Sequence, residues 1–403
     1  MRISCMGVAA CLLPAADSAG TAPRLLPSAP CMSMSRSAAA SAQGGGVGGG
    51  RSRRELLQRG AAAVAASAAT AALSGAAIVD AAEPIEYSLV NERIFDTQRR
   101  SFLPPAPQRL IRAGTLSPLV CVGEEHSHPL HHRMEFNIIK AVHAHHQAAE
   151  SNEPLAAAES SEPLAVGLET IYRHHQHLHA AESNEPLAVG LEMFYRQHQL
   201  ALDRYVFRHG SLGRLKLETG WDDMWGYDFN NYTKIFRFAR LNGVRLVGLN
   251  APIQLVSMVS KQGLDGLPRE LRPLLPDMDL HNERHRQRFD SAIAAVAAVH
   301  PVSGDALARM YQAQTLWDEY MSESAANYLS SRGGRMVLLA GSRHIESRDG
   351  IPDRVHRRLG GAEPFTVVPL SVDWTQDGLP DIDHPPGPSF ADWVYFTQKE
   401  LIV

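Results

Sequence analysis

The chain has 403 residues, of which 44% are apolar and 20% are charged. This is the composition of a soluble globular protein, and it excludes wholesale disorder, a collagen-like repeat and a polytopic membrane protein. The formal net charge is −4; residues 1–82 hold seven basic and three acidic residues, which leaves −8 for residues 83–403. An acidic body argues against nucleic acid or an anionic membrane as the main partner.

The first 82 residues have the composition of two targeting signals in series. Residues 1–50 are rich in Ala, Ser and Gly and almost free of acids, as is typical of an organelle transit peptide. In residues 51–82, Arg53 and Arg54 precede a weakly apolar run and the sequence Val79-Asp80-Ala81, an order typical of a twin-arginine signal with its cleavage site. We therefore expect a chloroplast protein of the thylakoid lumen. The run is mostly Ala, Ser and Gly, which argues against a stable transmembrane anchor in the mature chain.

Residues 83–403 are predicted to form one α/β domain with a mainly parallel sheet flanked by helices. Short, continuously apolar runs suit strands that are covered on both faces; they lie at 118–122, 186–191, 244–249, 336–340 and 365–370. Helical patterns lie between them, at 133–145, 197–207, 233–242, 253–261, 283–298 and 306–329. Segments 281–299 and 304–331 follow each other without a strand, which predicts an antiparallel helix pair covering one end of the sheet.

The sequence contains an internal repeat. Residues 159–173 recur almost unchanged at 182–196, and a shorter copy begins at Glu150. A solenoid needs at least three comparable units, so a repeat fold is not expected. Only one copy can occupy a given place in a sheet, and the second runs directly into the following helix. Residues 150–181 are therefore predicted to be a duplicated, His-rich insertion.

Polar side chains follow the predicted strands where those strands end. Glu124 and His126 follow the first, Glu192 ends the second, Asn250 ends the third and His344 follows the fourth. Carboxyl ends of parallel strands share one edge of a sheet, where ligands gather. Imidazole and carboxylate together ligate a divalent metal or act as base and acid. We predict a shared site there, and the candidate metal ligands are Glu124, His126, Glu192 and His344.

Simpler interpretations exist for several of these residues. Glu192 could interact with a helix dipole, and Asn250 could be the N-cap of a helix that starts near Ala251. His281 and His285, four residues apart on an Arg-rich helix, are predicted to lie on an exposed face. Helical spacing also predicts a core-facing stripe, or alternatively a support for a flat cofactor, formed by Met310, Gln314, Trp317 and Met321. The aromatic loop 221–227 could cap the core or line a pocket.

Taken as a set, the motifs resemble the ChaN-like haem-binding family of the Tiki/ChaN/erythromycin-esterase superfamily. They span roughly residues 115–370 in consistent order: Gly123-Glu124-Glu125-His126 with Pro129 and His132, Gly190-Leu191-Glu192-Met193-Phe194, Glu218-Thr219-Gly220-Trp221, Leu249-Asn250-Ala251-Pro252, Ala313-Gln314 with Trp317-Asp318, and Gly341-Ser342-Arg343-His344 with Gly350-Ile351-Pro352. The 150–181 insertion departs from the family pattern between the first two strands.

The resemblance implies binding of haem or a related tetrapyrrole, iron handling, tyrosinate ligation and paired haems in a homodimer. The cofactor-binding residues it implies are Glu124, His126, His132, Glu192, Asn250 and His344. Candidate tyrosine ligands are Tyr172, Tyr195, Tyr205, Tyr227, Tyr311 and Tyr320.

Two functions of different classes follow from these observations. In the first, the protein carries or buffers haem in the thylakoid lumen. In the second, the Glu/His site holds a divalent metal that activates water for hydrolysis of an ester or peptide bond. The sequence does not decide between a binding protein and an enzyme, and it neither supports nor opposes a role in the assembly of a photosynthetic complex.

Overall fold

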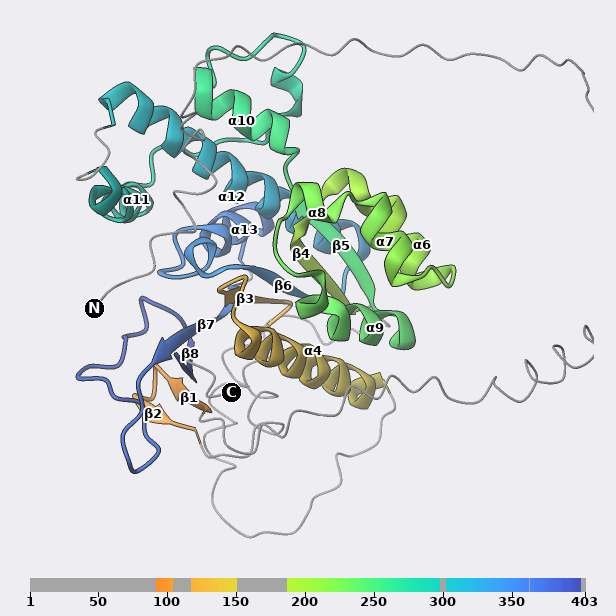
Figure 1. The fold of residues 1–403 in the computed structure, drawn as a ribbon, viewed down its shortest axis with the longest axis vertical. Coiled ribbons are helices and arrows are strands. Elements are labelled where there is room, and N and C mark those ends of the chain that lie inside the picture. Colours follow the sequence, from red (N-terminus) through yellow and green to blue (C-terminus); the bar gives the residue numbers. More distant parts are fainter. Residues whose placement is uncertain (1–91, 104–116, 151–186, 298–301, 362, 400–403) are drawn as a thin grey trace, which may run out of the picture. The chain divides into compact units, whose positions relative to one another are not determined.

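The computed structural model describes residues 92–103, 117–150, 187–297, 302–361 and 363–399 (Figure 1). The predicted targeting signals and the first copy of the repeat lie outside these residues. Among the helices of the described residues, none combines the length and the apolar character needed to span a bilayer.

The centre of the fold is an eight-stranded sheet with the order β2-β1-β8-β7-β3-β6-β4-β5. Its strands are β1 (Glu92–Asp96), β2 (Ser101–Phe102), β3 (Leu119–Glu124), β4 (Leu187–Tyr195), β5 (Arg245–Asn250), β6 (Arg335–Gly341), β7 (Phe365–Val372) and β8 (Trp393–Gln398). Every pairing from β8 to β5 is parallel, whereas β1 pairs antiparallel with both β2 and β8.

Helices surround the parallel strands (Figure 1). The α-helices are α4 (Pro129–Glu150), α6 (Gln199–Phe207), α7 (Leu212–Glu218), α8 (Trp221–Met224), α9 (Thr233–Asn242), α10 (Ile253–Gln262), α11 (Glu283–Ala297), α12 (Gly304–Arg332) and α13 (Ile351–Leu359). Short 3-10 helices connect some of them, at η2 (Arg196–His198), η3 (Phe229–Tyr232), η4 (Arg272–Leu274) and η5 (Ser342–His344).

Both faces of the sheet are covered, which explains the continuously apolar strands. In β3, Val120 and Val122 belong to the core cluster that also holds residues of α4, α6 and α9. The alternate residues Leu119 and Cys121 belong to a second cluster, with residues of α12 and α13. Figure 1 shows α4 and α9 on one side of the sheet and α12 and α13 on the other. A strand buried on both sides has no polar face, so its sequence does not alternate.

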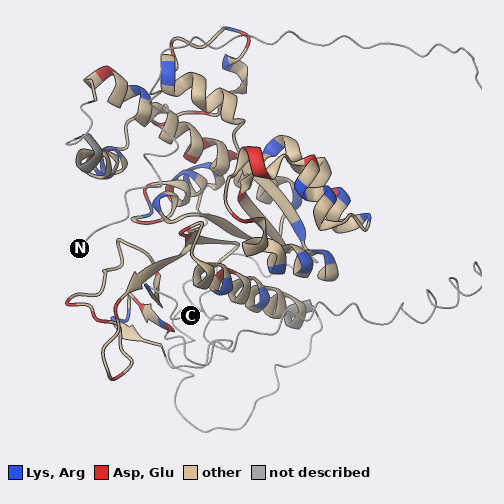
Figure 2. Ribbon diagram, in the orientation of Figure 1, with Lys and Arg blue, Asp and Glu red and all other residues tan. Residues whose placement is uncertain are grey.

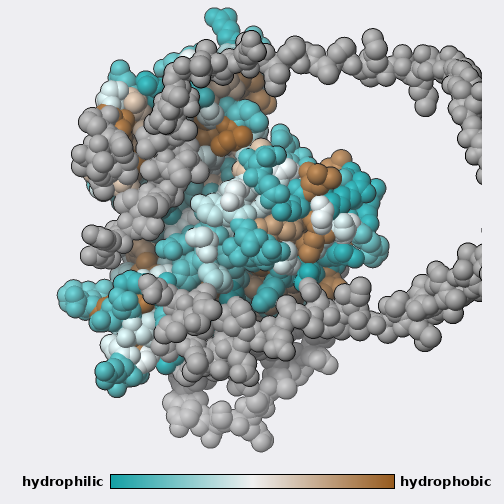
Figure 3. Space-filling view, in the orientation of Figure 1, coloured by the Kyte–Doolittle hydropathy of each residue, from teal (hydrophilic) through white to brown (hydrophobic). Residues whose placement is uncertain are grey.

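The Gln199 side chain binds backbone groups of the edge strand β5. The Gln199 carboxamide of α6 donates to the Leu246 carbonyl at 2.8 Å and accepts from the Gly248 N–H at 3.1 Å. These bonds occupy backbone groups through which an edge strand could recruit a second chain. The adjoining surface over α6, α7 and α9 is mostly hydrophilic and carries many Lys and Arg residues, with separate hydrophobic patches (Figures 2 and 3).

The predicted α/β class is confirmed, and β4 is formed by the second copy of the repeat, as expected. Two features differ from the prediction. Strands β1 and β8 extend the sheet on one side, and α13 covers it after β6. Helix α11 also does not run antiparallel to α12: in Figure 1 it is seen nearly end-on beside α12, so the two helices cross. Phe289 and Ile293 of α11 pack there with Met310 and Tyr311 of α12.

Candidate functional site

Three neighbouring strands, β3, β6 and β4, end at one rim of the sheet. Glu124 is in register with Gly341 across the β3–β6 pair. The Glu192 carboxylate crosses from β4 and accepts the Gly341 backbone N–H at 2.6 Å. His126 and His344 follow directly after β3 and β6. The structure therefore places Glu124, His126, Glu192 and His344, here called the rim cluster, at one edge of the sheet.

His126 is the most exposed member of the rim cluster, with 19% of its side chain accessible. Its Nδ1 lies 2.5 Å from Glu124 Oε1. Burial lowers the pKa of His126, but the Glu124 carboxylate outweighs this effect and raises it above the usual value. The rings of Trp225 and Tyr227 lie beside the imidazole, each with its centroid 4.8 Å from the His126 centroid. The aromatic loop thus lines the site, while Trp221 of the same loop is buried in the core.

Gly341 allows side chains of the rim cluster to pack close to its backbone. A Cβ atom at this position would lie 3.2 Å from His126 Nε2 and 3.7 Å from Glu192 Oε2. The backbone of Gly341, with φ −52° and ψ 139°, is open to any residue. The absence of a side chain therefore lets the His126 imidazole and the Glu192 carboxylate lie close to this backbone, and a methyl group here would crowd the imidazole.

Two carboxylates hold His344 in place. Its Nδ1 lies 2.5 Å from Asp318 Oδ1 of α12, and its Nε2 lies 3.4 Å from Glu192 Oε1. Burial disfavours the charged imidazole, but Glu192 and Asp318 raise the pKa of His344 to about 10. Conversely, burial opposes the ionisation of Asp318, yet His344 and His285 hold its pKa well below the usual range. At neutral pH His344 is therefore a charged imidazolium between the carboxylates of Glu192 and Asp318.

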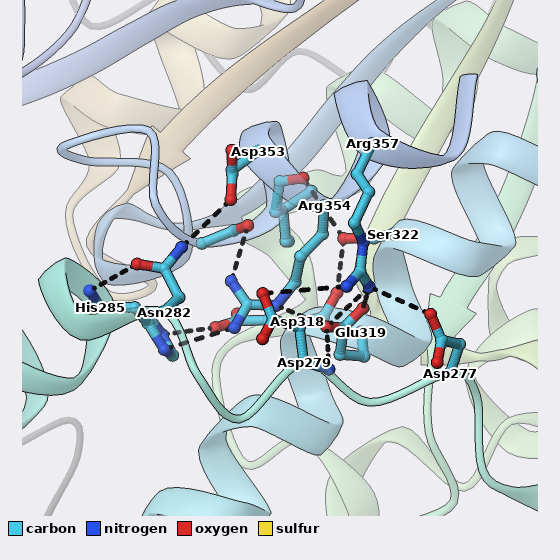
Figure 4. A network of polar contacts seen from close by, with 12 residues as sticks. Asp277, Asp279, Asn282, His285, Asp318, Glu319, Ser322, Asp353, Arg354 and Arg357 are labelled. Atoms are coloured by element: carbon cyan, nitrogen blue, oxygen red, sulfur yellow. Dashed lines mark hydrogen bonds and ion pairs between the residues drawn. The ribbon is translucent and has the colours of Figure 1, made fainter. Parts of the chain in front are cut away.

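The polar contacts continue from Asp318 into the helical layer (Figure 4). His285 of α11 places Nε2 2.9 Å from Asp318 Oδ2 and its Nδ1 3.2 Å from the Tyr311 hydroxyl. The prediction that His285 lies on an exposed face is wrong, since only 2% of the residue is accessible, whereas His281 is exposed. His285 packs against α12, a tertiary contact that a single helix pattern does not reveal.

His132 belongs to a second group, which shares Glu124 with the rim cluster. Its Nε2 donates to the His126 carbonyl at 3.0 Å, and its Nδ1 lies 3.0 Å from Glu135 Oε2 and 3.3 Å from Glu124 Oε2. Burial opposes protonation, but the two carboxylates raise the pKa of His132 to about 10. Tyr232 donates its hydroxyl to Glu124 Oε1 at 2.7 Å.

Glu124 and Glu135 share this buried environment but differ in charge. Burial and the Glu124 carboxylate raise the pKa of Glu135 well above its usual range. Burial also opposes the ionisation of Glu124, but Glu135 and the imidazoles of His126 and His132 hold its pKa well below the usual range. One carboxyl is therefore neutral and the other ionised, as expected when two carboxyls share one site.

Asn250 binds backbone groups rather than the side chains of the rim cluster. Its Nδ2 donates to the Glu192 carbonyl at 2.9 Å, and its Oδ1 accepts the Ala251 N–H at 2.8 Å. Helix α10 starts at Ile253 with Pro252 as its N-cap, so the N-cap interpretation of Asn250 is wrong. Asn250 instead holds β4 in position at the residue that carries the Glu192 carboxylate.

The helical stripe of α12 is mainly core, with one exception. Met310 and Met321 are buried in apolar clusters, and Trp317 packs against both clusters. Gln314 instead lies with its Nε2 3.3 Å from His344 Nδ1. This stripe therefore positions one polar side chain at the rim cluster.

Sequence reasoning missed Asp318, Glu135 and Tyr232 as members of these groups. Glu135 had a local signal, because it follows His132 at the i, i+3 spacing that brings two helical side chains together. Asp318 belongs to the quoted family motif Trp317-Asp318 but was not among the candidate site residues, and Tyr232 had no such signal. Each meets the site only through the packing of α12 and η3 on the sheet. As a whole, the site offers imidazole and carboxylate groups that can bind a metal ion or transfer protons.

Comparison with known proteins assigns the chain to a family. A sequence profile described as "Haem-binding uptake, Tiki superfamily, ChaN" matches residues 111–355, more than half of the chain. The chain belongs to the ChaN family. The matched region runs from before β3 to the middle of α13, so it contains every residue of the rim cluster. No curated protein matches the chain in sequence.

Solved structures agree with this assignment at the level of the fold. ChaN of Campylobacter jejuni, described by its cofacial haem binding, is 18% identical with a TM-score of 0.52 and covers 76% of this chain and 97% of its own. More distant similarities are the type III effector HopBA1 (11% identical, TM-score 0.37, 74% and 96% covered) and a mutant erythromycin esterase EreC in its open conformation (14% identical, TM-score 0.32, 76% and 83% covered). Neither of these two similarities supports a conclusion about this chain.

Proposed function

We propose that this ChaN-family protein binds haem or a related tetrapyrrole and serves as a carrier or buffer of it in the thylakoid lumen. Family membership supports haem as the ligand, and the aromatic side of the rim cluster supports this site as its location. Haem offers a large flat apolar surface and an iron that needs axial ligands. Trp225 and Tyr227 supply aromatic surface beside the partly exposed His126.

The placement of Tyr227 is the observation that carries the proposal. The family resemblance implies a tyrosinate ligand, and among the described candidates Tyr195, Tyr205, Tyr311 and Tyr320 are all buried. Tyr227 is partly exposed and packs beside His126. His126 in turn has its Nδ1 directed to Glu124, which leaves Nε2 as the nitrogen available for a ligand, in the manner of a histidine held by a carboxylate.

A spectral titration with hemin tests this function. The full chain should give a saturable Soret shift, and Tyr227→Phe should weaken hemin binding by about tenfold or more. His126→Ala should also weaken it. Tyr205→Phe is the matched control, because this tyrosine is buried and its hydroxyl has no hydrogen-bond partner. An absent or unsaturable shift in the wild-type chain would remove the proposal.

A homodimer with paired haems is part of the proposal, because the resemblance implies it. Light scattering during the titration should show the mass of two chains once hemin is bound. A chain that binds hemin and stays monomeric at saturation would refute the dimer while leaving haem binding intact.

The location in the lumen is supported by the order of signals in residues 1–82. A reporter fused to these residues should enter isolated chloroplasts and reach the lumen with the signals removed. Replacing Arg53 and Arg54 together by Lys should leave the reporter in the stroma. Accumulation of the double variant in the lumen would contradict a twin-arginine route.

A second candidate function is metal-dependent hydrolysis, favoured by the contact between the Glu192 and His344 side chains beside His126. A divalent metal held by Glu124, His126, Glu192 and His344 would supply a Lewis acid and a metal-bound water. Ester and peptide substrates should then be hydrolysed by the wild-type chain, and Glu192→Ala and His344→Ala should each abolish the activity. Unchanged rates in both variants would exclude this site as its source.

A further inference from the structure

A compact set of three ligand-capable side chains lies next to the rim cluster and is fully enclosed. Glu124 ends β3, while His132 and Glu135 project from successive turns of α4. The side chains of Glu124 and Glu135 are inaccessible, and 4% of His132 is exposed. We propose that Glu124, His132 and Glu135 form a buried site for a divalent first-row metal ion, which lies beside the rim cluster and shares Glu124 with it.

The distances match those between ligands of one small cation. One ligand atom from each residue lies within 4.8 Å of the other two. His132 Nδ1 is 3.0 Å from Glu135 Oε2 and 3.3 Å from Glu124 Oε2. Metal–ligand bonds of about 2.1 Å in a tetrahedral site place the ligand atoms about 3.4 Å apart. Little movement is needed for the three groups to close around an ion.

Unsatisfied oxygens point to a missing partner. Glu124 Oε2 and Glu135 Oε1 are buried and accept no hydrogen bond, and the nearest cationic group to Glu124 Oε2 is His132 Nδ1 at 3.3 Å. Buried carboxylate oxygens are costly without a donor or a cation. The basic residue adjacent to His132 does not supply one, because Arg133 is directed to Glu92 with its Nε 3.1 Å from Glu92 Oε1.

Surrounding hydrogen bonds hold the three ligands in a binding orientation. His132 donates Nε2–H to the His126 carbonyl, which turns Nδ1 toward the Glu124 and Glu135 carboxylates, where a bound ion would replace its proton. Glu124 receives the Tyr232 hydroxyl and the His126 imidazole on Oε1, which leaves Oε2 for the same ion. Such outer partners fix the tautomer of a ligating histidine and the orientation of a ligating carboxylate. The i, i+3 pair on α4 also resembles the helical Glu-x-x-His pairs that bind metals in helix bundles, with the order reversed.

The three proposed ligands favour some metal ions over others. One imidazole and two carboxylates suit Zn²⁺, Fe²⁺ or Mn²⁺ better than Mg²⁺ or Ca²⁺, which favour all-oxygen coordination. Because the group is enclosed, the ion is expected to stabilise the junction between β3 and α4 rather than to meet a substrate.

Zn²⁺ and Mn²⁺ are the probes for the test. The full chain is dialysed against micromolar metal, and the bound metal is counted per chain by mass spectrometry. We expect Glu135→Gln to bind one ion fewer than the wild type and to lose the rise in melting temperature that the ion produces. Glu135→Gln keeps the size of the side chain, so folding is expected to persist, and circular dichroism verifies it.

Glu192→Gln is the matched control, because it removes a buried carboxylate of the rim cluster and leaves the three proposed ligands in place. It should retain the ion and its thermal effect. Equal metal content in the wild type and Glu135→Gln would overturn the proposal, since the ions would then lie at other histidines. Loss of the ion in Glu192→Gln but not in Glu135→Gln would also overturn it, and so would a wild-type chain that binds no metal.

Discussion

The charge of His344 is set by two carboxylates from different elements. Glu192 comes from β4 and Asp318 from α12, and together they raise the pKa of His344 to about 10. In the unfolded chain the pKa of histidine is about 6.5. The folded state therefore binds more protons between these values, and the stability that this gives is fully present below about pH 6.5 and is lost as the pH rises through about 10.

Asp318→Asn should weaken this pH dependence. Without the carboxylate the pKa of His344 falls, so the free energy of unfolding should decline less steeply between pH 7 and 10 than in the wild type. Breaking a buried pair should also lower that free energy by about 3 kcal/mol at pH 7. Urea unfolding at several pH values measures both effects. Asp203→Asn, which removes a partly exposed partner of Arg245, is the control, and an unchanged slope in Asp318→Asn would contradict the assignment.

A second prediction concerns the effect of a side chain at Gly341 on hemin binding. Gly341→Ala places a methyl group 3.2 Å from His126 Nε2, the nitrogen proposed to be available for a ligand. Because the backbone conformation is ordinary, the chain should fold, and hemin binding should weaken by about tenfold because the methyl group crowds the His126 imidazole. Gly213→Ala on α7 is the control, since a Cβ there meets nothing within 4 Å. Equal hemin affinity in both variants would place the ligand elsewhere.

At the scale of elements, the sequence predicted the parallel strands well because each is a short apolar run buried on both faces. It missed β8, because no helical pattern in the sequence lies next to this segment. In the structure, Val394 and Phe396 of β8 are fully buried. It also missed α13, a helix of nine residues whose last turn holds His356, Arg357 and Arg358. These elements depend on tertiary partners, as Asp318 and Tyr232 do at the site. The rim residues were predictable because strand ends in a parallel sheet converge by topology alone.

Helices α12 and α13 are linked by a buried group of ion pairs as well as by apolar packing. Glu319 of α12 is inaccessible, and its oxygens lie 3.2 Å from Arg354 Nε and 2.9 Å from Arg357 of α13 (Figure 4). A third arginine of α13, Arg358, lies 2.6 Å from Glu319 Oε2. Arg354 is itself buried, with 2% exposed. Such a pairing costs desolvation on both sides, so its loss leaves a buried cation without its partner.

Glu319→Gln should therefore destabilise the protein by about 3–5 kcal/mol in chemical denaturation. The control lies on the same helix: Glu323 pairs with Arg196 at 3.0 Å, but both side chains are about one-third exposed. Glu323→Gln should cost less than about 1 kcal/mol. Similar losses in the two variants would show that the α12–α13 joint does not depend on the buried charge.

At the scale of the whole molecule, the repeat raises the question of which copy the fold needs. The second copy forms β4 between β6 and β5, with its Val189 and Leu191 fully buried. After its Glu192, Phe194 packs against Trp221 and Phe236. In the first copy the residue equivalent to Phe194 is Ile171, which lacks the aromatic ring that makes these contacts. The two copies are thus close in sequence but not interchangeable in the core.

One substitution made in each copy separates their roles. Val189→Asp places a charge inside the sheet and should destabilise the protein by more than about 4 kcal/mol, or prevent folding. Val166→Asp changes the equivalent residue of the first copy and should alter the free energy of unfolding by less than about 0.5 kcal/mol, because the place in the sheet is already filled. Denaturation of both variants, with hemin binding as a second readout, measures the difference. Equal destabilisation would mean that both copies contribute to the core, and a greater effect of Val166→Asp would assign the strand to the first copy.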